Sequence, residues 1–370
     1  MIEIVDSGVV YRNPLPHLRA LHAWHPSLVQ LGARQWLASF DLAEAVESHG
    51  YATYLSRSDD DGESWSAPVR VIDPAAHAGS CSLRLGKVGD GTLTLAGALH
   101  SPREHDQGIL NPETFGYTPM TLVLMTSTDD GAAWTAPRAL DHPFLEAPLE
   151  TCHSVVELDD GRWVLPTSTW RTWEGRDPHG MKAVLLESTD RGRTWPQGIV
   201  VADSWASTMT HFEQSLAQRS DGSLISVTWE YGVDSGITAP TPFALSSDGR
   251  TFDHRGRTGL LAQTAKLCVL PDDSLLVLWR GRDEPGLWAS RAHLEGRDWI
   301  TDESVQVWAG ALQQAEATST ADELSDLRFG YPSLVVRPDG DVEAVFWCRE
   351  NEQNIIRRVR IRVDNTEGNT

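Results

Sequence analysis

Residues Ser56–Trp65 read SRSDDDGESW, and the end of this segment recurs as STDDGAAW at Ser127–Trp134 and as STDRGRTW at Ser188–Trp195. A shortened copy, SSDGRTF, occupies Ser246–Phe252. The intact copies fit S-x-D-x-G-x-[TSA]-W, which describes a turn whose Asp accepts backbone N–H bonds and whose Trp closes the turn against the strands. The copies begin about sixty residues apart, and such a period indicates a repeat architecture.

A second repeat supports the first. A segment of the form S-[LV]-x-x-L-x-D-G, followed by a β-rich run, occurs six times. The six copies begin at His25, Cys81, His153, Glu213, Ala265 and Tyr331. Asp-Gly between two apolar runs predicts a hairpin. Six hairpins and four Asp-type turns predict an all-β chain, a six-bladed β-propeller of four-stranded antiparallel blades. We expect one domain over residues 1–362 and a flexible tail over 363–370.

Composition narrows the function classes. The chain of 370 residues carries 52 acidic and 31 basic residues, a formal charge of −21, which argues against binding to nucleic acid or to anionic membranes. Its four cysteines show no C-x-x-C spacing, so we expect buried free thiols and a reducing compartment. No leader and no long apolar run stands out, so we expect a cytoplasmic protein without a membrane span. The oligomeric state stays open.

The meander of each blade assigns the repeats to one face. The Asp-Gly turns and the Asp-type turns lie on the same face, and we expect them to be structural. On the opposite face the starts of the innermost strands and the ends of the second strands gather aromatic and charged residues, an arrangement that suits a sugar. Long connections at residues 100–119, 171–180 and 230–240 predict a pocket walled by blades two to four.

The expected substrate-binding residues of this face share that placement. They are Trp24, His25, Asp41, His49, Trp170, Arg171, His211, Trp229, Glu230, Arg280, Arg328 and Arg349. Among the histidines, His153 or His25 is the candidate for proton transfer near neutral pH. No His spacing typical of a metal site is present, so we expect no metal and no cofactor.

With its three intact Asp boxes and six hairpins, the chain resembles the sialidase (neuraminidase) superfamily over nearly its whole length. The resemblance implies a sialidase-type propeller that acts on a terminal sugar. FEQS supplies Glu213 where the family carries a Glu, and GYPSL supplies Tyr331 where the family carries a nucleophilic Tyr. A Tyr becomes nucleophilic when a carboxylate takes its proton, and the resemblance assigns that role to Glu213.

The chain also departs from the family pattern. Trp24 in AWHPSL, and Trp229 with Glu230 in VTWEY, stand where the family has two of its three carboxylate-binding Arg residues. Without this bidentate recognition, we do not expect cleavage of ordinary sialic acid. The loop of the first blade has no Asp at the place of the family's acid/base residue. That role stays open among Glu47, His49 and Asp41.

The leading hypothesis is an exo-acting glycoside hydrolase for a small carbohydrate or oligosaccharide, possibly acidic. Its catalytic candidates are Glu213, Tyr331, His153 and Glu47. One alternative is a uronate-specific lyase of the same fold, in which a His or a Tyr abstracts the C5 proton. A further alternative is a non-catalytic propeller that binds a glycan or a protein.

Overall fold

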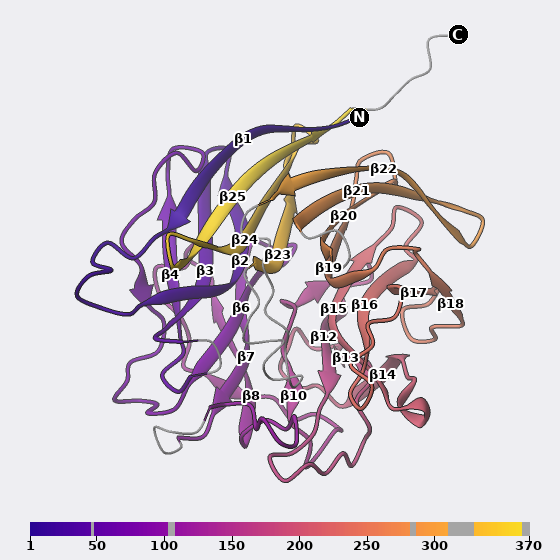
Figure 1. Ribbon diagram of the computed structural model, residues 1–370, viewed down its shortest axis with the longest axis horizontal. Coiled ribbons are helices and arrows are strands. Elements are labelled where there is room, and N and C mark those ends of the chain that lie inside the picture. The colour runs from indigo at the N-terminus through magenta and orange to yellow at the C-terminus, as the bar shows by residue number, and fades with distance from the viewer. Residues whose placement is uncertain (46–47, 103–107, 282–285, 310–328, 365–370) are drawn as a thin grey trace.

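The computed structural model describes residues 1–45, 48–102, 108–281, 286–309 and 329–364. Within them, strands β1 to β25 form six antiparallel sheets arranged around a central axis (Figure 1). The only helical segment of the described residues is a 3-10 turn at Trp205–Ser207. The chain is therefore an all-β, six-bladed propeller of the sialidase type, as the two repeats predict.

The blades follow the chain in order, each from the axis outward. Blade 1 is β2 (His22–Gly32), β3 (Gln35–Ala43), β4 (Ala52–Ser58) and β5 (Val69–Arg70). Blade 2 is β6 (Cys81–Lys87), β7 (Leu93–His100), β8 (Met120–Ser127) and β9 (Arg138–Ala139). Blade 3 is β10 (Leu149–Glu150) with β11 (Val156–Glu157), then β12 (Trp163–Thr169), β13 (Ala183–Ser188) and β14 (Gln197–Ala202). Blade 4 is β15 (Met209–Gln218), β16 (Leu224–Gly232), β17 (Pro242–Ser246) and β18 (His254–Arg257).

The last two blades complete the ring. Blade 5 is β19 (Ala262–Val269), β20 (Leu275–Gly281), β21 (Gly286–Glu295) and β22 (Asp298–Trp308). Blade 6 is β23 (Phe329–Val336), β24 (Val342–Glu350), β25 (Gln353–Val363) and the N-terminal β1 (Ile2–Tyr11). β1 pairs antiparallel with β25, from Ile2 opposite Val363 to Tyr11 opposite Ile356. The two ends of the chain thus close the propeller. The repeats do not reveal this role of β1, because they begin after it.

The apolar core lies in the junctions between neighbouring blades. At the junction of blades 6 and 1, Trp24, Trp36 and Phe40 are buried with Val345 and Trp347. Similar clusters join blade 5 to blade 6 and blade 1 to blade 2. Since strand residues alternate between two faces, each strand can bury one face against each neighbour.

The Asp boxes form the turns that their sequence predicts. In the third box, the Ser188 hydroxyl accepts from Gly192 N at 2.8 Å and Asp190 accepts from Thr194 N at 2.8 Å. The first two boxes repeat both bonds at the matching residues. Trp195 is completely buried. These residues hold a turn together, which confirms their structural role.

Each Asp box also receives an arginine from the preceding blade. In four of the junctions a guanidinium donates to a main-chain carbonyl of the next box. The pairs are Arg358 with Gly62, Arg57 with Asp130, Arg138 with Arg193, and Arg162 with Asp248. The box therefore ties its blade to its neighbour as well as closing its own turn.

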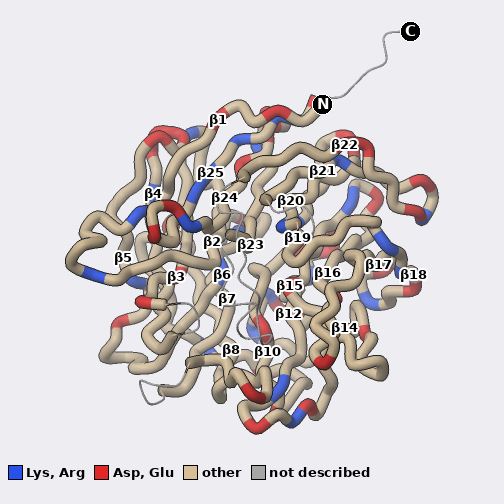
Figure 2. The backbone as a smooth tube through the Cα atoms, in the orientation of Figure 1, with Lys and Arg blue, Asp and Glu red and all other residues tan. Residues whose placement is uncertain are grey.

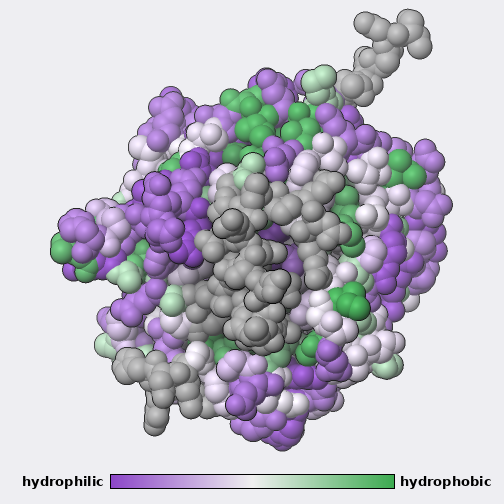
Figure 3. Space-filling view, viewed as in Figure 1, coloured by the Kyte–Doolittle hydropathy of each residue, from purple (hydrophilic) through white to green (hydrophobic). Residues whose placement is uncertain are grey.

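The surface and the cysteines can be compared with the expectations from composition. Figure 2 shows acidic and basic residues interspersed around the outer turns, and the face in Figure 3 is mostly hydrophilic with scattered hydrophobic residues. In the described part of the chain, no helix has the length and apolar character needed to cross a membrane. All four cysteines are free, and three of them are buried, as expected. Residues 365–370, most of the predicted tail, lie outside the described residues.

Candidate active site

A repeated β-bulge shapes the face opposite the Asp boxes. In four of the innermost strands, the pairing with the next strand skips one step. The skips fall between Trp24 and Ser27, Phe212 and Ser215, Ala262 and Ala265, and Gly330 and Ser333. His25, Glu213 and Tyr331 stand at three of these bulges with φ of 50°, 48° and 49°. Side chains other than Gly rarely adopt this backbone, and bulges that re-aim a side chain are common next to active sites.

The three bulge residues line one small cavity on the axis. Its volume is about 120 Å³, and residues from all six blades line it. Besides the bulge residues, the lining includes Trp24, Ser82, Arg84, His100, Tyr117, Glu150, Arg280 and Trp347. The expectation of a wall built by blades two to four alone is therefore too narrow. The volume is well below the roughly 300 Å³ at which pockets for drug-sized ligands begin, so the described residues enclose a small group.

Asp41 and Arg84 form the buried charge pair of this site. Arg84 Nη1 donates to Asp41 Oδ2 at 3.1 Å, and neither side chain is more than 4 % exposed. Asp41 also accepts from the hydroxyls of Ser82 at 2.5 Å and Thr53 at 2.7 Å. Burial would raise the pKa of Asp41, but Arg84, then His25 and Ser82, hold it below its ordinary value. Asp41 therefore stays ionised and fixes Arg84.

Arg84 in turn holds Tyr331. Its Nε donates to the Tyr331 hydroxyl at 3.0 Å, and that hydroxyl donates to the carbonyl of Thr151 at 3.2 Å. Burial raises the pKa of Tyr331 well above its ordinary value, although Arg84 acts in the opposite direction. The Tyr331 hydroxyl thus keeps its proton and donates it in a hydrogen bond to the Thr151 carbonyl, and the phenol is neutral in this arrangement.

His25 is oriented by the same carboxylate. Its Nδ1 lies 3.1 Å from Asp41 Oδ2, and its ring meets the Tyr331 ring edge-on at 5.2 Å. Burial lowers the pKa of His25, and its hydrogen bond to Asp41 only partly offsets that effect. A neutral imidazole held by a carboxylate can accept a proton from a bound molecule.

Two glutamates from neighbouring blades, Glu150 and Glu213, interact in the lining of this cavity. Glu213 N donates to Glu150 Oε2 at 3.3 Å, and the Glu213 carboxylate accepts from the Thr264 hydroxyl. Burial, and then the nearby Glu213, raise the pKa of Glu150 to about 7, while Lys266 lowers it by less. A carboxyl group whose pKa lies at about 7 can donate a proton near neutral pH.

Lys266 separates this cavity from a second one on the axis. Its Nζ donates to the carbonyls of Cys152 at 2.8 Å and Gln214 at 2.9 Å, and it lies 4.9 Å from the centre of the Tyr331 ring. The second cavity, of about 430 Å³, extends along the innermost strands toward Gln30 and Gly89. It is the larger of the two.

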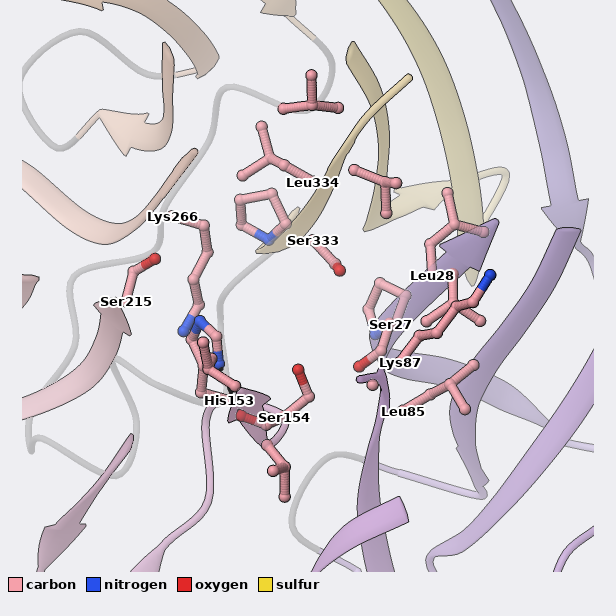
Figure 4. Close-up of a pocket in the computed structure, with 18 of the residues that line it drawn as sticks. Ser27, Leu28, Leu85, Lys87, His153, Ser154, Ser215, Lys266, Ser333 and Leu334 are labelled. Carbon is pink, nitrogen blue, oxygen red and sulfur yellow. Dashed lines mark hydrogen bonds between the residues drawn. The ribbon is translucent and has the colours of Figure 1, made fainter. Parts of the chain in front are cut away.

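His153, a predicted catalytic residue, lines this second cavity and not the one that contains Glu213. Figure 4 shows its ring beside Lys266, with the hydroxyls of Ser27, Ser154 and Ser333 around the same space. Burial, and then Lys266, lower the pKa of His153 to about 4. The structure therefore separates His153 from Glu213, whereas Tyr331 lines both cavities.

The predicted tryptophans divide into two groups. Trp24 lines the small cavity, and its ring lies 5.4 Å from that of Tyr51. Trp170 and Trp229 do not line it, because both pack on Phe212 with ring centroids 5.3 Å and 4.5 Å away. They support the bulge at Glu213 from behind.

The predicted arginines are scattered. Arg280 lines the small cavity and donates to the Phe329 carbonyl at 3.1 Å. Arg171 lies over the Trp205 ring at 5.1 Å, and Arg349 forms an ion pair with Glu352. Neither Arg171 nor Arg349 lines the cavity. Two other predicted residues, Glu47 and Arg328, lie outside the described residues.

The remaining predicted residues lie beside or away from the cavity. His49 is near His100, a lining residue whose pKa is lowered to about 4 by burial and then by His49. His211 and Glu230 are buried in a separate cavity between blades 3 and 4. The rim of the propeller therefore holds more than one polar site.

Sequence reasoning missed Arg84 and Glu150. Arg84 interrupts the apolar run CSLRLG, and a charge inside a buried strand requires a partner. That signal was available in the sequence. Glu150 in PLETCHS lies just before the repeated segment that begins at His153, so the repeat pattern does not include it. Among the described residues, no group of three His, Cys, Asp or Glu side chains is arranged to hold a metal ion.

Comparisons with known proteins agree with this architecture. A family model described as a BNR repeat-like domain matches residues 107–345, which is more than half of the chain. A crystal structure of a protein of unknown function from Dyadobacter fermentans superposes with a TM-score of 0.74 and 18% identity, covering 98% of this chain and 99% of that one. No curated protein matches.

Two enzymes are among the similar structures. The α-L-arabinanase of Penicillium chrysogenum, solved with arabinobiose, has a TM-score of 0.66 and 17% identity, covering 97% of this chain and 98% of its own. The NanB sialidase of Streptococcus pneumoniae has a TM-score of 0.64 and 12% identity, covering 95% of this chain and 70% of its own. At these identities, the likeness establishes a common fold.

Proposed function

The chain belongs to the BNR repeat-like domain family, and on this premise we propose that it is an exo-acting glycoside hydrolase that admits a terminal sugar to the small axial cavity. The observation that carries the proposal is the Glu150–Glu213 pair, two carboxyl groups in one cavity with the pKa of Glu150 raised to about 7. Hydrolysis of a glycosidic bond needs one carboxyl group that is protonated and one that is ionised.

The two carboxyl groups take different roles. Glu150, which keeps its proton up to about neutral pH, donates to the oxygen of the leaving group. Glu213, which is less buried and accepts from Thr264, is the carboxylate that assists attack at the anomeric carbon. The aromatic ring of Trp24 on the cavity wall suits the C–H face of a sugar.

Tyr331 and Arg84 position the substrate in this proposal. The Tyr331 hydroxyl already bonds to Arg84 and to the Thr151 carbonyl, and both residues line the cavity. Trp24 and Trp229 stand where a carboxylate-binding Arg pair would be needed for sialic acid. The substrate class that we propose is therefore a terminal sugar of a small carbohydrate other than ordinary sialic acid.

A lyase is the second candidate, and His25 favours it. A neutral His25, fixed by Asp41, is placed in the cavity to remove a C5 proton from a uronate. Lyase cleavage leaves an unsaturated product that absorbs in the ultraviolet, whereas hydrolysis does not.

The test is a screen of aryl glycosides and uronic-acid oligosaccharides with wild-type protein and four variants, Glu150→Gln, Glu213→Gln, His25→Ala and Glu63→Gln. We expect Glu150→Gln and Glu213→Gln each to lower kcat about 10²- to 10⁴-fold. Glu63→Gln, an exposed residue of the first Asp box, is the matched control and keeps wild-type turnover. Wild-type rates in both site variants contradict the proposal. Ultraviolet-absorbing products that require His25 decide for the lyase.

A further inference from the structure

The cavity between blades 3 and 4 is separate from the axial site. It has a volume of about 230 Å³ and shares no lining residue with either axial cavity. β14 of blade 3 forms one wall, and β16, β17 and β18 of blade 4 form the other. His211 and Glu230, which the sequence assigns to the main pocket, both lie here.

This junction is more polar than the junction of blades 6 and 1 and that of blades 5 and 6. The second strand of each blade turns alternate residues toward the preceding blade. In blade 1 these residues are Trp36, Ala38, Phe40 and Leu42, and in blade 6 they are Val342, Ala344, Phe346 and Cys348. In blade 4 they are Leu224, Ser226, Thr228 and Glu230, all buried. Polar groups in such a place cost stability unless they are bonded, so their presence calls for an explanation.

The polar groups form one hydrogen-bonded chain. His211 Nδ1 lies 2.9 Å from the Thr228 hydroxyl, and His211 Nε2 lies 2.9 Å from the Ser204 hydroxyl. Glu230 Oε1 is 3.5 Å from the same Nε2, and the other Glu230 oxygen accepts from Arg257. The wall is thus rigid and preorganised, with hydroxyl groups that can still donate or accept.

The charges at the mouth do not balance. Arg255 and Arg257 are both exposed on β18, two residues apart on one face of that strand. Arg257 is paired with Glu230, whereas Arg255 forms no ion pair with any described residue. Burial lowers the pKa of His211 to about 4, and although Glu230 opposes this shift, Arg257 and Arg255 add to it, so the ring is neutral. One positive charge is left over.

We propose that this cavity is a second ligand site, which takes a small hydroxycarboxylate. The carboxylate pairs with the guanidinium of Arg255 at the mouth. The hydroxyl group of the ligand bonds to Ser204 and Thr228, whose side chains the His211 ring holds in place. The volume equals that of several water molecules and suits a molecule of a few heavy atoms. The site is independent of the glycosidase proposal, because it shares no residue with the axial cavity.

Calorimetric titration with sodium glycolate, D-glycerate and acetate tests the proposal. We expect glycolate and glycerate to bind with a one-to-one stoichiometry, and acetate, which lacks the hydroxyl, to bind more weakly. Arg255→Gln should lower the affinity for glycolate about tenfold or more, the effect of losing a charged hydrogen bond. Arg176→Gln, an exposed loop arginine outside the cavity, should leave it unchanged. Ser204→Ala should abolish the preference for glycolate over acetate.

Three outcomes overturn the proposal. The first is an absence of binding heat with all three carboxylates. The second is wild-type affinity in Arg255→Gln. The third is loss of the glycolate signal in Glu213→Gln, which would assign the binding to the axial cavity. If Glu213→Gln removes glycosidase turnover and keeps glycolate binding, both proposals stand separately.

Discussion

The two faces of the propeller use repetition in opposite ways. On the Asp-box face, the same Ser–Gly and Asp–N–H bonds recur in three blades with the same residue types. On the opposite face, a left-handed residue at the bulge recurs in three blades, but it is His25 in blade 1, Glu213 in blade 4 and Tyr331 in blade 6. Repeated side chains therefore mark the scaffold. A repeated backbone conformation with different side chains occurs instead at the cavity that we propose as the active site.

The stability of the scaffold also holds the strained backbone of the bulge face in place. A left-handed backbone at a residue other than Gly costs on the order of 1–3 kcal/mol, and the small cavity has three such residues. Their strain persists only where the surrounding structure holds them, which is the task of the packed junctions and the Asp boxes. We therefore expect mutations on the Asp-box face to change stability, and mutations on the bulge face to change activity.

The largest expected effect on the scaffold is that of Trp195→Ala. Trp195 is completely buried, and its Nε1 donates to the Gly192 carbonyl at 3.1 Å. Its removal should lower the free energy of unfolding by about 3–5 kcal/mol. Denaturant unfolding measures this loss. Turnover per folded molecule should not change, because the residue lies on the face away from the cavity.

Trp134→Ala is the matched control within the same repeat. Trp134 is only half-buried in its own box, so its removal should cost less than that of Trp195. An equal cost in the two variants contradicts the role that we give to burial. Loss of turnover in a folded Trp195→Ala protein contradicts the separation of the two faces.

The fold was predictable because its signals are local and repeated. The Asp boxes and the Asp-Gly hairpins give the number of blades and their order without any long-range information. The closing pair of β1 and β25 could not be found in this way, since it joins residues at opposite ends of the chain and β1 has no repeat signature.

The site was predictable only in part. The repeat located His25, Glu213 and Tyr331, since each stands at the same step of its segment. It could not tell which strand-end residues turn inward, so Trp170 and Trp229 were included although they pack behind the cavity. Arg84 and Glu150 act through partners in other blades, and a single sequence does not show which distant residues meet.

A smaller and more uniform effect is expected from the serines of the boxes. Ser58→Ala, Ser127→Ala and Ser188→Ala each leave the N–H of the box glycine without its acceptor. Each should cost about 1–2 kcal/mol in unfolding free energy. Equal costs would confirm that the three boxes are one device used three times. Losses of unfolding free energy that differ among the three variants by more than about 2 kcal/mol would contradict the equivalence of the three boxes.

The smallest expected effect is on the bulge face, where the charge of Glu213 changes the pKa of Glu150. The pKa of Glu150 is raised to about 7 mainly by burial and then by Glu213. Glu150 is therefore protonated below about pH 7, and its capacity to act as an acid is lost as pH rises through that value.

In Glu213→Gln one negative charge disappears, burial remains, and the pKa of Glu150 should fall below about 7 without returning to its ordinary value. Titration of ¹³C-labelled glutamate carboxyl groups by NMR measures this shift without relying on turnover, and Glu63→Gln on the Asp-box face should leave it unchanged. A pKa of Glu150 that is the same in Glu213→Gln and in wild type would mean that the two carboxyl groups do not interact, and the division of acid and base roles between them would fail.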